Sequence, residues 1–325
     1  MAGTTPDVGV IIAAYNAERT IERAVRSALA EPETCEVILV VDGATDGTAE
    51  RARAADDGTG RLQVVELARS GGPAAARNVA LAASRAPWIC PLDADDYFLA
   101  GRLARLRGEV GYCDFVADDL LRAVEGRLNA PPHAMIGDRM NLPACLSFET
   151  FVRGNISRAN LPRAELGFLK PLMRRAFLEA NRLRYDETLR LGEDFALYAR
   201  ALALGARFKI LPPCGYVAVE RGDSISSRHG AAELRALERA NRDIETLKLT
   251  PEELAALREH RAHVSAKAVL REFLDAKRAG GLLGAAAVLA RAPQAAPYVV
   301  TTVATDVLRR WSTHDNAAGS GAAAA

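Results

Sequence analysis

The stretch Pro91-Leu92-Asp93-Ala94-Asp95-Asp96-Tyr97-Phe98 places three carboxylates within four positions. It follows Ala86-Pro87-Trp88-Ile89-Cys90, an apolar run of the length of a buried strand. Open α/β sheets bind ligands at the carboxyl ends of their strands. Clustered carboxylates repel one another unless a cation lies between them, and hard oxygen donors suit Mg²⁺ or Mn²⁺. The stretch predicts a metal-diphosphate site or, more plainly, a polar turn with an aspartate that caps the next helix.

Three more apolar runs precede this stretch, and segments with helical spacing or helix-start signals lie between them. Val8–Ala13 is a near-continuous β-branched run, typical of a strand buried on both faces. The other two strands are expected at 37–41 and 62–67, and the helices at 21–29, from Thr45 or Asp46 to about 55, and from 73 to about 84. This alternation predicts right-handed βαβ units and a parallel sheet, hence the α/β class.

Two nucleotide-dependent enzyme classes are disfavoured by the turn after the first strand. It carries no G-x-G-x-x-G, which a dinucleotide-dependent oxidoreductase would be expected to have there. The segment 13–17 also lacks the glycine-rich phosphate loop of a sugar nucleotidylyltransferase. The parallel sheet must therefore serve another chemistry.

The overall composition excludes other classes. The chain has 42 Lys and Arg against 41 Asp and Glu, so nothing points to nucleic acid as a partner. Its five cysteines show no CxxC spacing, as expected of free thiols in a reducing compartment. The first residues lack a signal-peptide pattern, and no apolar run is long enough to span a bilayer. We expect a soluble protein of the cytoplasm or a peripheral protein at the inner face of the cytoplasmic membrane.

The second half of the chain shows shorter elements. Apolar residues at 115–117 predict a strand that ends in Asp118 and Asp119, and segments 210–212 and 216–219 predict short edge strands. Glu193 and Asp194 open an amphipathic helix, where acids in the first turn favour the helix dipole. From spacing alone, that stabilising role is the preferred interpretation of the pair.

Beyond Gly230 the composition shifts to Ala, Leu, Arg and Glu at helical period, which predicts a helical extension over 230–316. Gly280-Gly281 interrupts it, and apolar patches follow at 282–290 and 298–303, before Arg309-Arg310-Trp311. These patches fit peripheral membrane contact through residues 282–311, a cap on the core, or a subunit contact. The tail 317–325 is expected to be disordered.

Four motifs occur in the order and spacing of family 2 glycosyltransferases, which the chain resembles. They are Ala13-Ala14-Tyr15-Asn16-Ala17-Glu18, Val41-Asp42-Gly43-Ala44-Thr45-Asp46-Gly47-Thr48, Gly72-Pro73-Ala74-Ala75-Ala76-Arg77-Asn78 and Leu92-Asp93-Ala94-Asp95-Asp96. The resemblance implies a GT-A fold, a Rossmann-like, mostly parallel sheet flanked by helices, over residues 1–229. Its nucleotide-binding half would cover about 8–100 and its acceptor and base half about 101–229. Val41 and Ala44 depart from the family pattern, which usually has an acid and a serine there.

The resemblance also implies roles for individual residues. Asp95 would bind the metal, and Asp93 would contact the ribose, or the metal through water. Asp194 would be the catalytic base, with Glu193 orienting it or contacting acceptor hydroxyls. The other nucleotide-binding candidates are Ala14, Tyr15, Glu18, Asp42, Arg77 as a counter-charge for the acids, and Arg221, with Arg228 and His229 as further diphosphate contacts. The acceptor-contact candidates are Asp118, Asp119, His133, Asn155 and Arg158.

The segments 153–156, 165–175 and 190–194 look particularly like rhizobial succinoglycan-type glucosyltransferases. That similarity implies an inverting, Mg²⁺- or Mn²⁺-dependent transfer of glucose from UDP-glucose to a polyprenyl-diphosphate-linked oligosaccharide in exopolysaccharide biosynthesis. The alternatives are another UDP-sugar, a lipopolysaccharide or capsule acceptor, and a non-catalytic GT-A scaffold subunit. The scaffold would be marked by loss of Asp93, Asp95 or Asp194, and all three are present.

Overall fold

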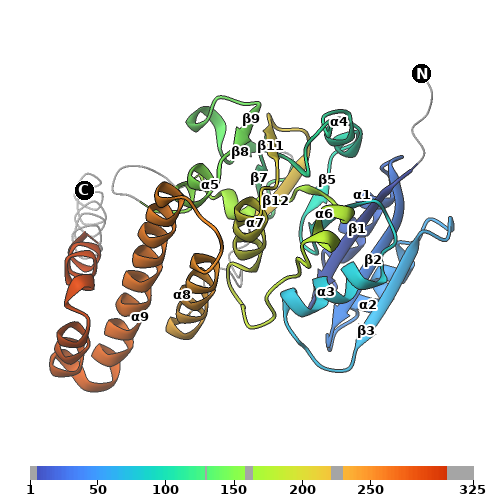
Figure 1. Ribbon diagram of the computed structural model, residues 1–325. Helices are drawn as coiled ribbons and strands as arrows, with labels where there is room; N and C mark the ends of the chain where they lie inside the picture. Colours follow the sequence, from blue (N-terminus) through green and yellow to red (C-terminus); the bar gives the residue numbers. More distant parts are fainter. Residues whose placement is uncertain (1–5, 129, 158–163, 221–229, 306–325) are drawn as a thin grey trace, which may run out of the picture.

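A mixed eight-stranded sheet forms the centre of the fold in the computed structural model, which describes residues 6–128, 130–157, 164–220 and 230–305 (Figure 1). Its strand order is β3-β2-β1-β4-β10-β6-β11-β9. The first four strands pair in parallel, as the alternation of strands and helices predicted. They are β1 (Val8–Ala14), β2 (Thr34–Asp42), β3 (Leu62–Leu67) and β4 (Trp88–Asp93).

Three helices connect these strands, and their apolar faces explain the burial of β1 and β2. They are α1 (Ile21–Leu29), α2 (Thr48–Ala54) and α3 (Pro73–Ala83). The apolar residues of α1 that recur at helical spacing are the ones that are buried. Helix α3 begins at Pro73, whose fixed φ suits the first helical position. β3, at the sheet edge, is only partly buried.

The register of β1 brings the predicted site residues to one edge. Ala13 of β1 is aligned with Asp93 of β4, and Ala14 is aligned with Val41 of β2. Asp42, the last residue of β2, therefore lies at the same carboxyl edge as Asp93. This is the edge at which open α/β sheets bind their ligands.

The second half of the sheet departs from the parallel pattern, because β10 runs antiparallel between β4 and β6. The predicted edge strand at 210–212 was wrong in position: β11 lies between β6 and β9. The elements of this half are α4 (Arg102–Gly108), β6 (Phe115–Asp118), β9 (Ala144–Leu146), α5 (Phe148–Gly154), β10 (Leu172–Arg174), α6 (Arg175–Ala180), α7 (Glu193–Ala203) and β11 (Phe208–Leu211).

A small second sheet, with the order β5-β12-β7-β8, starts directly after the acidic turn. Its strands are β5 (Tyr97–Phe98), β7 (Leu121–Val124), β8 (His133–Ala134) and β12 (Tyr216–Glu220). β12 pairs with both β5 and β7, so it is not the edge strand that the sequence predicted. The edge prediction failed because short apolar strands also suit the inside of a small sheet.

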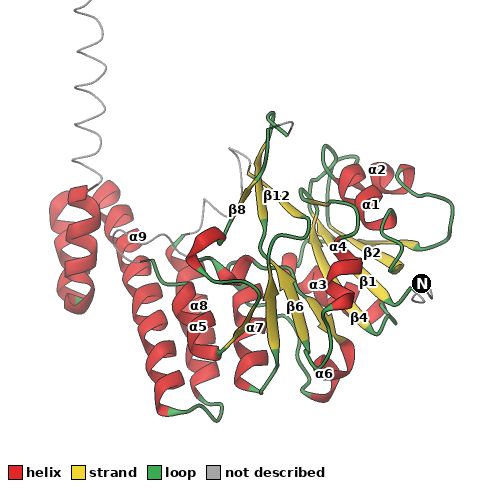
Figure 2. Cartoon of the chain, turned by 90° about the horizontal axis from the view of Figure 1, so that it is seen from above, coloured by secondary structure: helices red, strands yellow, loops and turns green. Residues whose placement is uncertain are grey.

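The C-terminal region is helical, with α8 (Ala231–Glu245) and α9 (Pro251–Arg291) at the end of the molecule away from β3 (Figures 1 and 2). The Thr250 side chain and Glu253 form a capping box that starts α9. The ring of His260 on α9 stacks on Phe195 of α7 with a centroid distance of 4.2 Å, which ties the extension to the catalytic half. Among the described residues, no helix is both long and apolar enough to cross a bilayer.

Candidate active site

Asp42 holds the loop that leads into α3. Its carboxylate accepts hydrogen bonds from the Ser70 hydroxyl at 2.7 Å and from the backbone N–H groups of Gly71 and Gly72, both at 2.8 Å. The side chain is buried, with 3% of its surface exposed. A carboxylate offers about four lone-pair sites, so one remains for a further donor such as a uracil N–H. The position of Asp42 is compatible with the nucleotide role implied by the family motif.

The first two motifs are linked by hydrogen bonds into one surface. Asn16 Oδ1 accepts from the N–H of Thr45 at 2.9 Å, and Glu18 accepts from the N–H of Gly47 at 3.0 Å. Asp46 accepts from the N–H groups of Glu18 and Thr48. Burial works to raise the pKa of Asp46, but the hydrogen bonds from Thr48 and from these backbone groups lower it overall.

A pocket of about 260 Å³ lies on this surface; it is lined by Asn16, Ala17, Glu18, Arg19 and Asp46. Tyr15, with 49% of its surface exposed, precedes these residues on the same turn. Ala14 is buried at the end of β1, so its side chain faces the core. Glu18 lines this pocket, and the ribose contact that the family motif implies for it stays a prediction.

Arg77 on α3 joins the metal motif to the base motif. One of its guanidinium nitrogens lies 2.7 Å from Oδ1 of Asp93, and the other lies 2.7 Å from Oε1 of Glu193. The second nitrogen is also 3.6 Å from Oδ1 of Asp194. Arg77 is 5% exposed and is therefore the counter-charge for the acids that the family resemblance implied.

Lys170 is a second buried cation in this cluster, and the sequence analysis gave it no role. Its ammonium lies 2.9 Å from Oδ2 of Asp93 and 2.7 Å from Oδ2 of Asp194. The side chain is 4% exposed. A usable signal was present, because a lysine between Leu169 and Pro171 in an apolar segment is rarely buried without a paired acid.

We call Arg77, Asp93, Lys170, Glu193 and Asp194 the charge cluster. Three carboxylates face two cations, so the cluster has one excess negative charge when every group is ionised. Burial works to raise the pKa of Asp93, but Lys170 and Arg77 hold it well below its usual range. Burial raises the pKa of Asp194, and Arg77 and Lys170 only partly oppose this rise. Asp93 and Asp194, which both pair with Lys170, thus differ in proton affinity.

Asp194 has the features that a general base requires. Its Oδ2 is held by Lys170, whereas the buried Oδ1 has no hydrogen-bond partner among the described residues. A raised pKa brings a carboxylate closer to the operating pH and so makes it a better proton acceptor. Asp194 lies in the first turn of α7, as predicted, but the charge cluster assigns it more than a helix-dipole role.

The three acids of the opening stretch take different positions. Asp96 is buried and accepts from the Tyr216 hydroxyl and from the N–H of Val219, both at 2.8 Å. Burial and the nearby Asp93 and Asp95 raise the pKa of Asp96 well above its usual value. Asp96 therefore fastens the acidic turn to the second sheet.

The donor set of the turn fits a metal ion that is held by one protein carboxylate. Both oxygens of Asp93 already face cations, and both oxygens of Asp96 accept hydrogen bonds, so neither of these acids is well placed for direct coordination; Asp95 stays the metal ligand that the family motif implies. Asp95 is half-buried. Mg²⁺ is commonly held by one or two carboxylates together with substrate phosphates. Within the described ranges, no group of three His, Cys, Asp or Glu residues is arranged as a metal cage.

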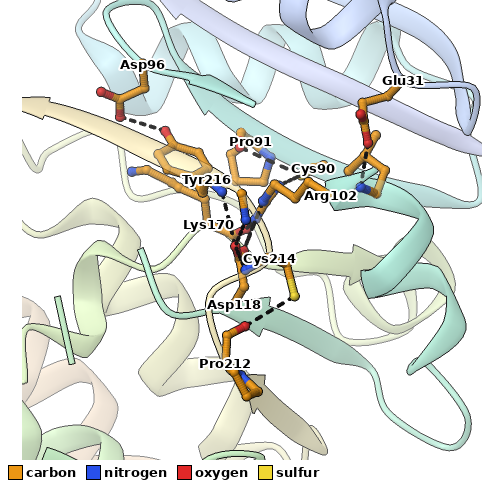
Figure 3. Close-up of polar contacts among 12 residues, drawn as sticks. Glu31, Cys90, Pro91, Asp96, Arg102, Asp118, Lys170, Pro212, Cys214 and Tyr216 are labelled. Atoms are coloured by element: carbon orange, nitrogen blue, oxygen red, sulfur yellow. Dashed lines mark hydrogen bonds and ion pairs between the residues drawn. The ribbon is translucent and has the colours of Figure 1, made fainter. Parts of the chain in front are cut away.

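A fully buried ion pair, Arg102 with Asp118, lies next to Lys170 of the charge cluster (Figure 3). Arg102 donates to Oδ1 of Asp118 through two nitrogens, at 2.9 and 2.7 Å, and to the carbonyl oxygen of Lys170 at 2.7 Å. Oδ2 of Asp118 accepts from the backbone N–H groups of residues 214–216. The pair thus fixes the backbone beneath both Lys170 and Tyr216.

The predicted acceptor contacts of Asp118 and Asp119 were wrong, because both side chains are buried with structural partners, whereas those of Asn155 and His133 stay predictions. Asp118 and Asp119 are each 0% exposed, and Asp119 accepts from the N–H groups of Ile136 and Gly137. Asn155 accepts from the N–H of Gly167 and donates to the carbonyl of Phe151. His133 is exposed on β8. The candidates Arg158, Arg221, Arg228 and His229 lie outside the described residues.

Comparisons with known proteins agree with this geometry. The family described as glycosyl transferase family 2 matches residues 9–157. The succinoglycan biosynthesis protein ExoU of Rhizobium meliloti is 48% identical over 95% of this chain and 90% of its own length. The structure of S. aureus TarS 1–349 in complex with UDP-GlcNAc has a TM-score of 0.58 at 22% identity, over 82% of this chain and 72% of that one. A mannosyltransferase from Pyrobaculum calidifontis in complex with GDP-Man and Mn²⁺ has a TM-score of 0.55 at 20% identity, over 95% of this chain and 84% of that one. The chain belongs to the family 2 glycosyltransferases and has a GT-A-like fold.

Proposed function

We propose that this glycosyltransferase transfers glucose from UDP-glucose, with inversion, to a polyprenyl-diphosphate-linked oligosaccharide in exopolysaccharide biosynthesis. The observation that carries the chemistry is the pairing of Asp194 with Lys170 beside Asp93, at the same edge as Asp42. The printed name of the 48% identical relative supports exopolysaccharide synthesis. A neighbour with UDP-GlcNAc bound supports a UDP-sugar donor.

In the proposed reaction, Oδ1 of Asp194 accepts the proton of the acceptor hydroxyl while that oxygen attacks the anomeric carbon. Asp194 must lie within hydrogen-bond reach of the hydroxyl, and its Oδ1, which accepts no hydrogen bond among the described residues, suits this role. One direct displacement inverts the configuration, so an α-linked donor gives a β-linked product. Glu193, held by Arg77, would orient the base or contact acceptor hydroxyls.

On the donor side, Asp42 and Glu18 would contact the uracil and ribose, with Ala14 and Tyr15 beside them. Asp93, fixed by two cations, would contact the ribose, or the metal through water. A Mg²⁺ or Mn²⁺ ion at Asp95, when bound, would supply positive charge to the departing diphosphate. The neighbour with Mn²⁺ bound supports metal use, and Arg221 is proposed as a further diphosphate contact.

The domain arrangement proposed for this activity keeps residues 1–229 as the catalytic unit and residues 230–316 as a helical extension. Because the acceptor is lipid-linked in this proposal, the protein would work at the inner face of the cytoplasmic membrane. Residues 282–311 would make the peripheral contact, and the described part of them is exposed at Leu282 and Leu283.

The first test is calorimetric titration of UDP, UDP-glucose and GDP-mannose, each with and without Mn²⁺. Metal-dependent binding of the two uridine ligands, and no binding of GDP-mannose, is the expected result. Absence of binding to all three would contradict the donor site and favour a non-catalytic GT-A scaffold.

A panel of UDP-sugars, assayed with lipid-linked oligosaccharide acceptors, then tests the glucose assignment. Release of UDP from UDP-glucose, which depends on the acceptor, would support it. Faster turnover of a different UDP-sugar, or of a lipopolysaccharide or capsule intermediate, would replace the proposed substrates and keep the reaction class.

A further inference from the structure

A twelve-residue segment of the C-terminal hairpin, Ala279 to Ala290, contains only glycine, alanine, leucine and valine. It lies where α9 breaks, because Gly280 and Gly281 leave the helical conformation. Gly281 has φ of 64° and ψ of −155°, a region that is essentially restricted to glycine. The break turns the chain into a hairpin whose second arm starts at Leu282 (Figure 1).

The inner face of this second arm is buried against the rest of the hairpin. Val288 and Leu289 pack on a cluster that contains Val269, Ala295 and Val299. Ala285 is 1% exposed. This packing accounts for the apolar character of one side of the arm and fixes which side faces outward.

The outer face is apolar as well. Leu282 and Leu283 are 76% and 86% exposed, and Ala286, Ala287 and Ala290 on the same arm are also exposed. A helix at an aqueous surface normally carries polar side chains on its outer face. Two adjacent leucines that are almost fully exposed at the end of a hairpin therefore indicate a surface that meets something other than water.

The charged residues between positions 276 and 305 are all cations. No Asp or Glu occurs between Ala276 and Thr305, whereas Lys277, Arg278 and Arg291 flank the apolar segment and are exposed. The nearest acid, Asp275, lies 3.5 Å from Arg278, and both side chains are largely exposed. Such an exposed pair contributes little, so the positive potential of the segment remains.

We propose that residues 276–291, which we call the hairpin tip, dock onto an anionic lipid surface. Leu282 and Leu283 enter the boundary between headgroups and acyl chains, and the three cations contact lipid phosphates. The segment is too short to span a bilayer, which is consistent with an anchor that lies in the membrane interface. The functional reason for this membrane contact rests on the proposed lipid-linked acceptor. The argument that the surface binds lipid uses only the residues of the hairpin tip.

The charges favour lipid over a second copy of this chain. A two-fold contact through the same surface would bring the hairpin tips of both copies together. Lys277, Arg278 and Arg291 would then approach the same cations of the other copy without an acid between them, and such like-charge contacts are unfavourable. Lipid phosphates supply the missing negative charge.

The test is flotation of the full chain with vesicles of equal parts phosphatidylglycerol and phosphatidylcholine, compared with phosphatidylcholine alone. We expect binding to the anionic vesicles that weakens with added salt. The double variant Leu282→Gln/Leu283→Gln should lose at least about tenfold in vesicle affinity, and Lys277→Gln/Arg278→Gln/Arg291→Gln should lose a similar factor. The control is Tyr112→Gln, which removes an equally exposed apolar side chain, 84% exposed, from another part of the surface.

Unchanged vesicle binding by the leucine variant, or equal binding to both vesicle types, would overturn the proposal. Light scattering could instead show that the wild-type chain is a dimer and that the leucine variant is a monomer. That result would mean that the hairpin tip binds a second copy of this chain and not lipid. UDP titration of the same variants separates this inference from the proposed function. Loss of vesicle binding with normal UDP binding supports the hairpin tip, whereas absence of UDP binding in every variant and in the wild type contradicts only the transferase assignment.

Discussion

The ammonium of Lys170 lies 2.7 Å from Oδ2 of Asp194 and 2.9 Å from Oδ2 of Asp93, so one buried cation joins the base motif to the metal motif. The two acids are distant in sequence: Asp93 is the last residue of β4, and Asp194 lies in the first turn of α7. Because both acids share Lys170, a change in the charge of Asp93 should change the proton affinity of Asp194, and the reverse.

Replacement of Lys170 by Met should lower kcat at neutral pH by at least about tenfold and should change UDP affinity much less. Burial already raises the pKa of Asp194, and removal of a cation raises it further. The base must be deprotonated to act, so the acidic limb of the kcat profile should move to higher pH. Lys209→Met, at a lysine paired with Glu109 on the surface, is the control. An unmoved acidic limb would reduce Lys170 to a packing role.

Asp194→Asn should bind donor normally and transfer at least about a hundredfold more slowly, because a positioned general base contributes that order of acceleration. Single-turnover measurement of UDP release, with acceptor present, checks it. Glu193→Gln is the matched comparison, since Glu193 shares Arg77 with the base. If Asp194→Asn turns over near the wild-type rate and Glu193→Gln does not, the roles of the two acids are reversed.

Asp95→Asn should abolish the metal-dependent part of UDP binding and leave the fold intact. The family motif implies Asp95 as the metal ligand, and Asp93 and Asp96 are held by cations and hydrogen bonds of their own. Calorimetry with and without Mn²⁺ measures the effect, and a chelator should reproduce it in the wild type. Asp57→Asn, on an exposed turn that precedes β3, is the control. Metal-dependent affinity that survives in Asp95→Asn would place the ligand elsewhere.

The nucleotide half of the fold could be predicted from the sequence because its strands are short apolar runs that alternate with helical segments, and β1, β2 and β4 are largely buried. The roles of Asp42, Glu193 and Asp194 came from the family resemblance and stay predictions, since spacing alone favoured a helix-dipole role for Glu193 and Asp194. The apolar surroundings of Lys170 indicate in the sequence that it is buried with an acid, but its partners, like those of Arg102, could not be identified, because they depend on β10 entering antiparallel between β4 and β6. Asp118 and Asp119 look like loop acids in sequence, and only the packing of Arg102 and of residues 136–137 shows that they are structural.

Gly72→Ala should destabilise the protein and weaken UDP binding. Gly72 has φ of +93°, and an added Cβ would lie 2.1 Å from Nη1 of Arg190, so both the backbone and the guanidinium must shift. The shift would also disturb the N–H that Gly72 donates to Asp42. Gly58→Ala is the control, because Gly58 has φ of +75° and nothing within 4 Å, so it carries the conformational cost of about 1–2 kcal/mol alone. Equal losses of stability in the two variants would show that the Arg190 side chain moves away from the added Cβ without a measurable cost in stability.

Arg102→Met should cost about 3–5 kcal/mol of the free energy of unfolding, because it leaves Asp118 as a buried carboxylate without its cation. Both side chains of this pair are 0% exposed, so water cannot replace the guanidinium. Arg53→Met, which removes an exposed pair with Glu66, should change the free energy of unfolding little and is the control for chemical denaturation. Arg102 also donates to the carbonyl oxygen of Lys170, so any folded Arg102→Met protein should show the same shifted pH profile as Lys170→Met, in a weaker form. A variant that is as stable as Arg53→Met would mean that the backbone donors of residues 214–216 suffice to hold the Asp118 charge.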